Sequence, residues 1–366
     1  MQHGGGVRER GIQQKVKAWV LHGVDQLRFE DMEKAVPKAG EALVSVRAAG
    51  VCGSDIPRIY RTGTHKFPLI PGHEFSGEVA ALGEGTDSRW LGERVGIFPL
   101  IPCGKCGPCR KRQYEMCRDY SYLGSRRDGG FAEYVTVPQW NLIRLPKQVS
   151  FEEAAMLEPM AVAVHAMKRG LGGRMGEDKK TAAVCGLGTI GLLLLMFLKE
   201  AGVEKVFVMG NKDFQRNAAR KLGVGERDYC DIRKEYGPSW LMERTQGQGV
   251  DIFFECVGKN ETCSLAVDAA AAGGSVVLVG NPCSNMLFEK DVYWKILRNQ
   301  LHVTGTWNSS FSHEAEDDWN YSLTRLAGKR IDPAGIISHR YSLDQLHRGL
   351  EIMRDKTEDY GKVMIV

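Results

Sequence analysis

The sequence predicts an α/β protein of two domains, one mostly β and one built on a doubly wound parallel sheet. Its 366 residues exceed the size at which a single hydrophobic core usually keeps growing. Short β-type runs divided by Gly, Pro and Asp occupy residues 16–146, and apolar strands alternate with helical segments over residues 161–305. The second pattern is typical of a parallel sheet packed between helices.

The individual elements follow in chain order. The first unit has strand candidates at 42–47 and 133–137. The buried strand candidates of the second unit are residues 181–185, 205–209, 250–255 and 275–279. The elements after Trp307, which we expect to return to the first unit, are helices at 317–326 and 343–355 and a closing strand at 362–366.

The domain boundaries follow from these elements. We place the first domain at residues 15–160 and 308–366, with a cysteine-rich lobe at 100–120, and the second domain at 161–307. Residues 1–14 contain three consecutive glycines and several charges. We expect them to form a disordered extension.

Composition excludes several classes of partner. The 49 basic and 45 acidic residues leave a net charge of +4, too little to predict binding to nucleic acid or to an anionic membrane. The longest apolar run, from Ile190 to Leu198, is too short to span a bilayer. No signal peptide is apparent, and five further cysteines, one of them Cys283, are scattered through apolar stretches. We therefore expect a cytoplasmic protein.

Four cysteines form a compact cluster in a Gly- and Pro-rich loop. They are Cys103, Cys106, Cys109 and Cys117. Thiolates at this spacing favour a single tetrahedral zinc ion, and four protein ligands would make that zinc structural, because no position stays open for a substrate. Two disulfides, an iron–sulfur cluster and a nucleic-acid-binding zinc ribbon are the alternatives.

A glycine-rich turn carries the cofactor signal. Gly186, Gly188 and Gly191 form GxGxxG directly after the strand at 181–185 and open an apolar helix. This context is the one in which the motif binds a dinucleotide, with the pyrophosphate at a helix N-terminus. The same glycines, taken alone, would also serve close packing of a helix on a strand.

The next strand end predicts the choice of cofactor. NAD-specific folds usually place a carboxylate there, but residues 210–212 read Gly-Asn-Lys. We expect NADP(H) rather than NAD(H), since Lys212 would attract a 2′-phosphate; the alternative is that Asp213 turns inward and serves NAD. The candidate cofactor-binding residues are Gly186, Gly188, Thr189, Ile190, Gly191, Gly210, Asn211, Lys212, Val257 and Val279.

The first domain contains a second set of zinc-type ligands. Cys52 lies in a CGSD turn, His73 and Glu74 lie in PGHEFSG, and Glu158 precedes Pro159 at the domain boundary. A lone Cys or His is more often a packing residue. Three protein ligands with one exchangeable position would form a catalytic zinc site.

These motifs, in this order, resemble the zinc-containing medium-chain dehydrogenases and reductases from Lys15 to Val366. The matching strings are CGSD at 52–55, PGHEFSGEV at 71–79, the four-cysteine lobe, DGGFAEY at 128–134, LEP at 157–159 and GLGTIG at 186–191. The resemblance implies a GroES-like catalytic domain, a Rossmann domain and two zinc ions per chain.

The same resemblance implies roles for individual residues. Cys52, His73 and Glu158 would surround the catalytic zinc, Glu74 would ligate it directly or exchange with water, and Asp55 would orient His73. Many alcohol-oxidising members carry a proton-relay histidine where this chain has Pro57. Ser54 is therefore the expected proton acceptor, so that Ser54 and Glu74 are the candidate catalytic residues.

The third ligand, Glu158, is a cysteine in alcohol-oxidising members and places this chain nearer the polyol (sorbitol) dehydrogenase branch. Within that branch the strings CGSDIPRIY at 52–60, GSRRDGGFAEY at 124–134 and ILRNQLHVTGTWN at 296–308 most resemble galactitol-1-phosphate 5-dehydrogenases. The substrate-binding candidates are Arg58, His65, Arg126, Arg127, Trp307 and Asn308. The arginines are equally compatible with solvated or ion-paired surface positions.

We expect hydride transfer between a nicotinamide and a secondary hydroxyl or ketone of a polyol or a sugar-alcohol phosphate. The alternatives are an unphosphorylated polyol, an amino-polyol, or a catalytically silent nucleotide-binding relative. We also expect a homodimer or homotetramer in which the strand at 275–279 pairs across a two-fold axis.

Overall fold

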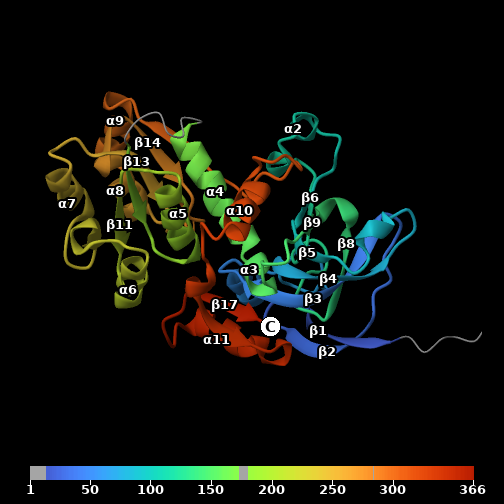
Figure 1. Ribbon diagram of the computed structural model, residues 1–366. Helices are drawn as coiled ribbons and strands as arrows, with labels where there is room; N and C mark the ends of the chain where they lie inside the picture. The colour runs from blue at the N-terminus through green and yellow to red at the C-terminus, as the bar shows by residue number, and fades with distance from the viewer. Residues whose placement is uncertain (1–13, 173–179, 283) are drawn as a thin grey trace, which may run out of the picture.

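Two large sheets stand next to each other in the computed structural model, which describes residues 14–172, 180–282 and 284–366. Helices α4 (Leu157–Leu171) and α10 (Asp318–Ala327) lie between them (Figure 1). One hydrophobic cluster joins the two halves, since it contains Phe98 of the first half and Val184 of the second. The extension expected at 1–14 lies outside the described residues except for Gln14, and so does Cys283.

The strands account for both sheets and two small ribbons. In chain order they are β1 (Lys15–Leu21), β2 (Leu27–Glu33), β3 (Glu41–Val51), β4 (Glu74–Leu82), β5 (Arg94–Ile97), β6 (Leu100–Ile101), β7 (Ser121–Tyr122), β8 (Tyr134–Pro138), β9 (Leu142–Arg144), β10 (Thr181–Cys185), β11 (Lys205–Gly210), β12 (Tyr229–Asp231), β13 (Val250–Glu255), β14 (Ala270–Leu278), β15 (His302–Gly305), β16 (Ile337–Tyr341) and β17 (Lys362–Ile365).

Helices cover the second half most densely. Besides α4 and α10 they are α1 (Asp55–Pro57), α2 (Gly107–Arg110), α3 (Phe151–Ala155), α5 (Thr189–Glu200), α6 (Asp213–Lys221), α7 (Gly237–Arg244), α8 (Asn260–Ala269), α9 (Lys290–Arg298) and α11 (Leu346–Asp355). None of the helices in the described ranges is both long and apolar enough to cross a bilayer.

The parallel sheet has the strand order β12-β11-β10-β13-β14-β15, and every neighbouring pair in it is parallel. Its side chains alternate between two covered faces, as buried parallel strands require. Ala182 and Val184 join the cluster of α4 and α5, whereas Ala183 and Cys185 join the cluster of α7 and α8. The predicted doubly wound α/β fold is confirmed.

One expectation about this sheet is wrong. The strand predicted at 275–279 forms the end of β14, which pairs with β13 on one side and with β15 on the other. Both of its edges are used, so it cannot pair across a two-fold axis. The edge strand is β15, which pairs only with β14 in the described part of the chain.

The mostly β half is built on a second sheet, of order β16-β17-β3-β4-β5-β9, with β8 also paired to β3. The C-terminal strand β17 returns to this sheet and runs antiparallel to β3, with Val363 opposite Val51. Strand β3 runs antiparallel to β4, with Gly50 opposite Glu74. The C-terminal end of β3 and the N-terminal end of β4 therefore meet at one point beside β17.

Helix α4 links the two halves and follows a short helix, α3, whose start is set by a local cap. The hydroxyl of Ser150 accepts a hydrogen bond from the amide of Glu153, whose carboxylate accepts one from the amide of Ser150. This capping box begins α3, and α4 follows directly after Met156. The arrangement places Glu158 in the first turn of α4, facing the first half.

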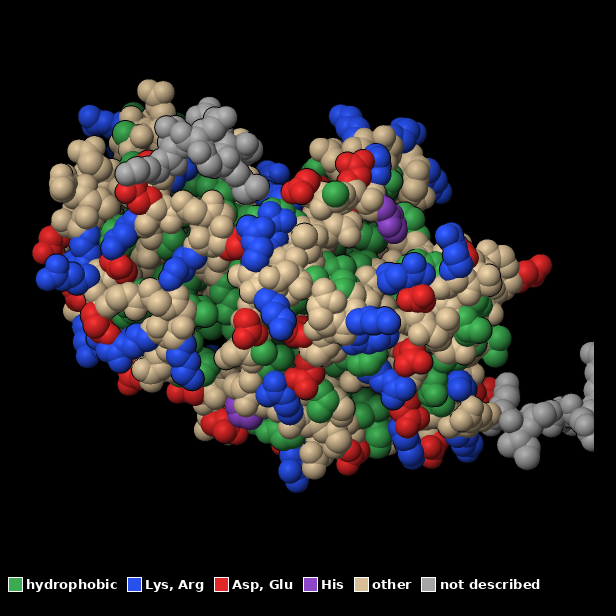
Figure 2. All heavy atoms as spheres, in the orientation of Figure 1, with side chains coloured by type: hydrophobic (Ala, Val, Ile, Leu, Met, Phe, Trp, Pro, Cys, Tyr) green, Lys and Arg blue, Asp and Glu red, His purple; other side chains and the backbone are tan. Residues whose placement is uncertain are grey.

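Charges of both signs are mixed on the surface. On the face shown in Figure 2, Lys and Arg side chains alternate with Asp and Glu, and no broad area carries a single sign. This mixture agrees with the small net charge of the sequence.

Candidate functional site

Three zinc-type ligands meet where β3 ends and β4 begins. Cys52 follows the last residue of β3, His73 precedes β4, and Glu74 is the first residue of β4. One ligand atom from each lies within 4.8 Å of the other two. The antiparallel pairing of β3 and β4 thus brings together residues that are more than twenty positions apart.

Asp55 supports this group from the first turn after β3. Its carboxylate is fully buried and accepts hydrogen bonds from the backbone amide of Cys52 (3.0 Å) and from Nη1 of Arg58 (2.7 Å). The same carboxylate lies 3.4 Å from Nδ1 of His73. Burial alone would raise the pKa of Asp55, but the charges of His73 and Arg58 outweigh burial and lower it.

The imidazole of His73 is oriented as a metal ligand would be. Its Nδ1 is buried and makes no hydrogen bond to any described residue, although it faces Asp55. Burial lowers the pKa of His73, but Asp55 and the Cys52 thiolate raise it well above its usual value. A ring that faces the Asp55 carboxylate through Nδ1 and also interacts with Cys52 has the surroundings of a ligating histidine.

Glu158 approaches the group from the first turn of helix α4, which links the two halves. Its Oε1 accepts a hydrogen bond from the hydroxyl of Tyr122 (3.3 Å), and the Tyr122 ring packs on His73. Burial, reinforced by the charge of Glu74, raises the pKa of Glu158 to about 7. Glu158 is not part of the tight three-residue group, which contains Glu74 instead.

The donor set fits a divalent zinc ion. A thiolate, an imidazole and carboxylates are the usual ligands of zinc in proteins. Arg58 pairs with Asp55 and Lys362 with Glu74. Glu158 is bonded by the neutral Tyr122 hydroxyl, so a metal cation here would stabilise its charged form. The residues at the end of β3 and the start of β4 therefore form a candidate metal site.

Ser54 and Pro57 flank the ligands as the sequence places them. The hydroxyl of Ser54 donates to Sγ of Cys52 at 3.3 Å. Pro57 is exposed and ends α1, and a proline side chain has no proton to relay. Of these two residues, Ser54 is therefore the one whose side chain could accept or donate a proton beside Cys52.

The four cysteines of the lobe form a second cluster. Sγ of Cys109 lies 3.9 Å from Sγ of Cys103 and 3.4 Å from Sγ of Cys106, and Sγ of Cys106 lies 3.9 Å from Sγ of Cys117. Zn–S bonds of about 2.3 Å in a tetrahedron place sulfur atoms roughly 3.8 Å apart. A disulfide requires about 2.05 Å, so the spacing favours a single ion.

Backbone amides prepare these sulfur atoms for a cation. Amides of Arg118 and Cys109 donate to Cys106 and lower the pKa of its thiol to about 6. Burial raises the pKa of Cys109 to about 12. The contrast indicates that the cluster needs a positive charge at its centre before all four thiols ionise. The lobe is held to the molecule by Arg112, which bonds the carbonyl of Ser312.

The glycine-rich turn has the geometry of a phosphate cradle. Gly186 has φ +96° and a side chain there would meet Val257; a side chain at Gly191 would lie 1.9 Å from the carbonyl oxygen of Gly186. At Gly188, the N-cap of α5, a side chain would meet nothing within 4 Å. Packing therefore requires two of the glycines, while the third leaves open space at a helix N-terminus without a side-chain cap.

The other predicted cofactor residues lie at the carboxyl ends of the parallel strands. Gly210 ends β11, Val257 follows β13 and Val279 follows β14. The strand order reverses between β10 and β13, and ligands of such sheets bind at that switch point. Thr189 and Ile190 form the first turn of α5.

The residues after β11 carry more positive than negative charge. Nζ of Lys212 lies 3.6 Å from a carboxylate oxygen of Asp359, and Asn211 is fixed through its amide by Gln215. Asp213, the alternative NAD residue, pairs with Arg233 at 2.7 Å. No carboxylate at this strand end is free of a cationic partner in the described residues.

The substrate candidates divide into two groups. Arg58 bonds Asp55, and the guanidinium of Arg126 stacks on Tyr120 with its carbon 4.5 Å from the ring centroid. Burial and the charges of Arg126 and Arg58 lower the pKa of His65, so these three lie near one another. Arg127 instead bonds Glu41 and Thr136. Trp307 is exposed, and Asn308 has φ +54°.

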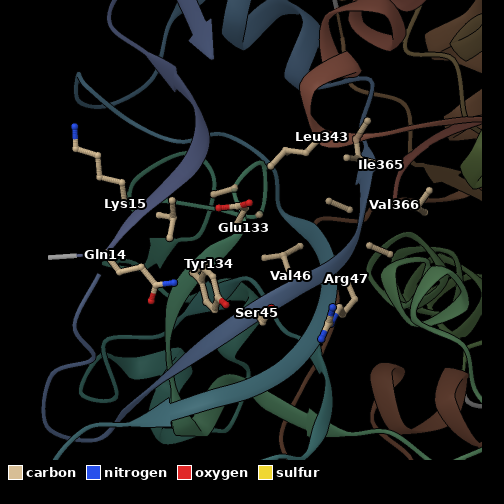
Figure 3. A pocket seen from close by; sticks show the side chains of 15 residues that line it. Gln14, Lys15, Ser45, Val46, Arg47, Glu133, Tyr134, Leu343, Ile365 and Val366 are labelled. Atoms are coloured by element: carbon tan, nitrogen blue, oxygen red, sulfur yellow. The ribbon is translucent and has the colours of Figure 1, made fainter. Parts of the chain in front are cut away.

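A cavity of about 490 Å³ lies elsewhere, between β1, β3, β8 and the C-terminus. Figure 3 shows Tyr134, Val46 and Leu343 along it. None of the candidate metal, cofactor or substrate residues lines this cavity. It has no part in the site.

Two residues at the metal site are missing from the sequence-based set. Tyr122 bonds Glu158, and Nζ of Lys362 lies 2.5 Å from Oε2 of Glu74. Lys362 begins the apolar run KVMIV. A lysine within such a run predicts a buried ammonium that needs an acidic partner, so this pattern could have identified Lys362.

Comparison with known proteins finds matching family models and similar relatives. Residues 38–147 match the family model of the alcohol dehydrogenase GroES-like domain, and residues 189–327 match that of the zinc-binding dehydrogenases. The chain is 32% identical over 328 residues to galactitol 1-phosphate 5-dehydrogenase of Escherichia coli (strain K12), covering 89% of this chain and 92% of that relative.

Solved structures share the whole architecture. A zinc-binding dehydrogenase from Sinorhizobium meliloti 1021 bound to NADP has a TM-score of 0.85 and 27% identity, covering 97% of this chain and 100% of that one. An alcohol dehydrogenase from Escherichia coli CFT073 complexed with NADH has a TM-score of 0.85 and 26% identity, covering 96% and 99%.

The two cysteine-containing sites should respond differently to loss of one thiol. Cys109→Ser should remove one of about two zinc ions per chain and lower Tm by on the order of 10 °C, because a structural ion contributes directly to folding. Cys52→Ser should lose the other ion with a much smaller change in Tm. Metal analysis and calorimetry check this; full metal content in Cys109→Ser would contradict it.

Proposed function

The chain belongs to the zinc-containing medium-chain dehydrogenases and reductases, as its motifs predicted, and we propose that it oxidises a secondary hydroxyl of a polyol or sugar-alcohol phosphate. The reverse reaction reduces the matching ketone. The observation that carries this proposal is the buried group of Cys52, His73 and Glu74, with Glu158 beside it. The similarity to a galactitol 1-phosphate 5-dehydrogenase along most of the chain supports it.

In this proposal Cys52, His73 and Glu158 surround the catalytic zinc, and Glu74 ligates it directly or exchanges with water. Cys103, Cys106, Cys109 and Cys117 hold a structural zinc. When bound, the catalytic zinc lowers the pKa of the reacting hydroxyl, and the nicotinamide exchanges the hydride. Asp55 keeps the His73 ring in orientation. Tyr122 does the same for Glu158 through its 3.3 Å hydrogen bond.

Ser54 handles the proton. Its hydroxyl can rotate from Sγ of Cys52 toward a substrate oxygen, because a hydroxyl carries one rotatable proton and two acceptor lone pairs. It would accept the released proton and pass it toward solvent. Pro57 offers no such route.

The domains take separate parts in this reaction. We assign catalysis to residues 15–160 and 308–366, since β17 joins the sheet of β3 and β4. We assign dinucleotide binding to residues 161–307, which contain the whole parallel sheet. The cofactor would lie along Gly188 and α5, with its reactive ring toward the metal site.

The cofactor we propose is NADP(H). The end of β11 lacks a free carboxylate, and Lys212 and Arg233 stand close by. A 2′-phosphate would replace Asp359 or Asp213 as their partner. The solved neighbours include one with NADP and one with NADH, so this choice depends on the residues of this chain.

A turnover panel tests both choices. Polyols with and without a terminal phosphate would be assayed with NADP and with NAD, using Cys52→Ser as the inactive control. We expect turnover of a polyol or its phosphate with kcat/KM at least about tenfold higher for NADP, because each charge-assisted bond to the 2′-phosphate favours it. A strong NAD preference would refute the cofactor assignment, and no turnover of any polyol would refute the substrate class.

The phosphate of a sugar-alcohol phosphate has a candidate binding place outside the metal site. Arg58 is tied to Asp55, which faces His73. Arg126 is tied to Tyr120, which packs on Tyr122 beside Glu158. His65 is exposed, and the charges of both arginines lower its pKa. Arg126 pairs with no carboxylate among the described residues. Cations placed in this way favour a substrate anion.

Arg126→Gln therefore tests recognition of the phosphate. We expect KM for the phosphorylated substrate to rise roughly 10- to 100-fold, the worth of a hydrogen bond to a charged group, while the unphosphorylated polyol is unaffected. Arg127→Gln is the matched control, because that arginine bonds Glu41 and Thr136. Steady-state kinetics checks this; equal effects of the two substitutions would contradict it.

We also propose that two copies associate through the edge of the parallel sheet. Strand β15 is the edge strand, and its neighbourhood exposes large apolar side chains. They are Met286, Leu287, Phe288, Tyr293, Trp294, Leu297, Val303 and Trp307. An exposed apolar area joined to an unpaired strand edge favours a self-complementary partner.

Leu287→Glu should dissociate this assembly, because it puts a charge into the apolar contact. We expect the wild-type chain to sediment as a dimer or tetramer at micromolar concentration and the variant to sediment as a monomer. Leu91→Glu, also at an exposed leucine but in the other half, is the control and should not dissociate. A monomeric wild-type chain would overturn the proposal.

A further inference from the structure

A buried carboxylate outside the metal site has partners on a second helix and on a loop. Asp318, in the first turn of α10, is 2% exposed. Its Oδ2 lies 2.8 Å from Nδ1 of His165 and accepts a hydrogen bond from the backbone amide of Ser310 at 2.7 Å. Its Oδ1 lies 3.0 Å from Nζ of Lys168. A carboxylate at this depth without such partners would be costly, so the group is a built feature.

The surroundings of Asp318 keep it charged. Burial alone would raise the pKa of Asp318, but its hydrogen bond with His165 and the charges of His165 and Lys168 outweigh burial and lower it. An ionised carboxylate only accepts hydrogen bonds, so Nδ1 of His165 and the amide of Ser310 both donate to it. Bonds to a charged acceptor are roughly twice as strong as those between neutral groups. Asp318 therefore ties the backbone of Ser310 to α4, which carries His165 and Lys168.

The loop that Asp318 binds begins at the carboxyl edge of the parallel sheet. Strand β15 ends at Gly305, and the amide of Thr306 donates to the carbonyl of Leu278, the last residue of β14. Val279, a candidate cofactor residue, follows directly. In a doubly wound sheet each half binds one mononucleotide at this edge. The residues proposed for the adenosine ribose follow β11, so the half made of β13, β14 and β15 would receive the nicotinamide.

The two neighbours of Asp318 bind the same loop. The Asp317 carboxylate accepts a hydrogen bond from the amide of Ser312 at 2.9 Å. The indole of Trp319 donates to the hydroxyl of Ser309 at 2.9 Å. All three contacts come from the start of α10, so the path of the loop follows the position of this helix.

An open space beside the loop explains why such bonds are needed. A second cavity of about 490 Å³ lies between α4, the start of α10 and β15. Ser310, Asp318, His165 and Lys168 are among the residues that line it. Side chains do not fill this volume, so close packing alone would not stop the loop from shifting into it. The ionic contacts of Asp318 supply that restraint.

Helix α4 connects this contact to the metal site. His165 is seven residues after Glu158, and residues seven apart lie on the same face of a helix. At a rise of 1.5 Å per residue, the two positions are about 10 Å apart along the axis. The same helix therefore carries the Glu158 carboxylate in its first turn and holds the loop after β15, through Asp318, two turns later (Figure 1).

We propose that Asp318 is a positioning residue that fixes the loop at 306–313 relative to α4, so that the nicotinamide ring is held at the correct distance from the metal site. The inference rests on the proposed function, because it takes the chain to bind a nicotinamide cofactor beside Cys52. Hydride transfer needs reacting atoms about 3 to 3.5 Å apart, and a displacement of about 1 Å can cost on the order of 100-fold in rate. Loss of the Asp318 charge would loosen the nicotinamide end of the cofactor alone.

The test measures binding to the full-length protein without any substrate. NADPH, NADH and their fragments without nicotinamide, 2′-phospho-ADP-ribose and ADP-ribose, are titrated by calorimetry, and the tighter dinucleotide is compared with its own fragment. Hydrogen exchange of the loop is measured without cofactor. The variants are Asp318→Asn, Lys168→Met and Lys168→Arg. Glu200→Gln is the matched control, because Glu200 is a buried carboxylate that pairs with Arg325 near the other end of α10.

In Asp318→Asn the affinity for the dinucleotide should fall about 10-fold, the worth of a hydrogen bond to a charged group. The affinity for the fragment should stay within about twofold, because the fragment does not reach the loop. Amides of residues 306–313 should exchange faster. Lys168→Met should show the same selective loss by a smaller factor, and Lys168→Arg, which keeps the positive charge, should bind as wild type does. Glu200→Gln should change neither binding nor exchange in the loop.

Equal losses of dinucleotide and fragment in Asp318→Asn would overturn the proposal, and so would unchanged dinucleotide affinity or unchanged exchange in the loop. A selective loss of the same size in Glu200→Gln would also contradict it. If Asp318→Asn does not fold, Lys168→Met decides; if neither folds, the contact serves stability and the proposal is wrong. None of these measurements uses a polyol, so failure to turn one over would count against the proposed function alone.

Discussion

The arrangement of the molecule depends on neutralising charges that are buried where β3, β4, β17 and α4 meet. Asp55, Glu74 and Glu158 are each at most 8% exposed, and each has a specific partner: Arg58, Lys362 and Tyr122. These partners come from three separate parts of the chain. An unpaired acid at this depth would be costly, so the charges require β3, β4, the start of α4 and the C-terminal strand to close together.

Much of the fold could be predicted because its signals are local. The apolar residues of β10, of β11 and of β13 each form a continuous run, and the glycines around the start of α5 are close together in the sequence. Each of these patterns indicates the local backbone structure by itself. The four-cysteine lobe is equally local, with all its ligands within fifteen residues. Such features need no knowledge of what packs against them.

The rest depends on contacts between distant residues. Lys362 pairs with Glu74, which is 288 positions away in the sequence. The sequence KVMIV does not indicate which residue that partner is. The expected pairing of residues 275–279 across a two-fold axis was wrong for a related reason. An apolar sequence does not show whether a strand is central or at an edge of the sheet. The edge position is taken by β15, which pairs with β14. Arg126 and Arg127 are neighbours in sequence, yet the sheet directs one to Tyr120 and the other to Glu41.

Strand β17 brings Lys362 into the sheet that also holds Glu74. During translation Lys362 emerges after Cys52, His73, Glu74 and Glu158, because it follows all four in the sequence. Until β17 joins β3, the Glu74 carboxylate therefore lacks its ammonium partner. The electrostatic balance of this buried site is thus completed after the residues of the site themselves have been synthesised.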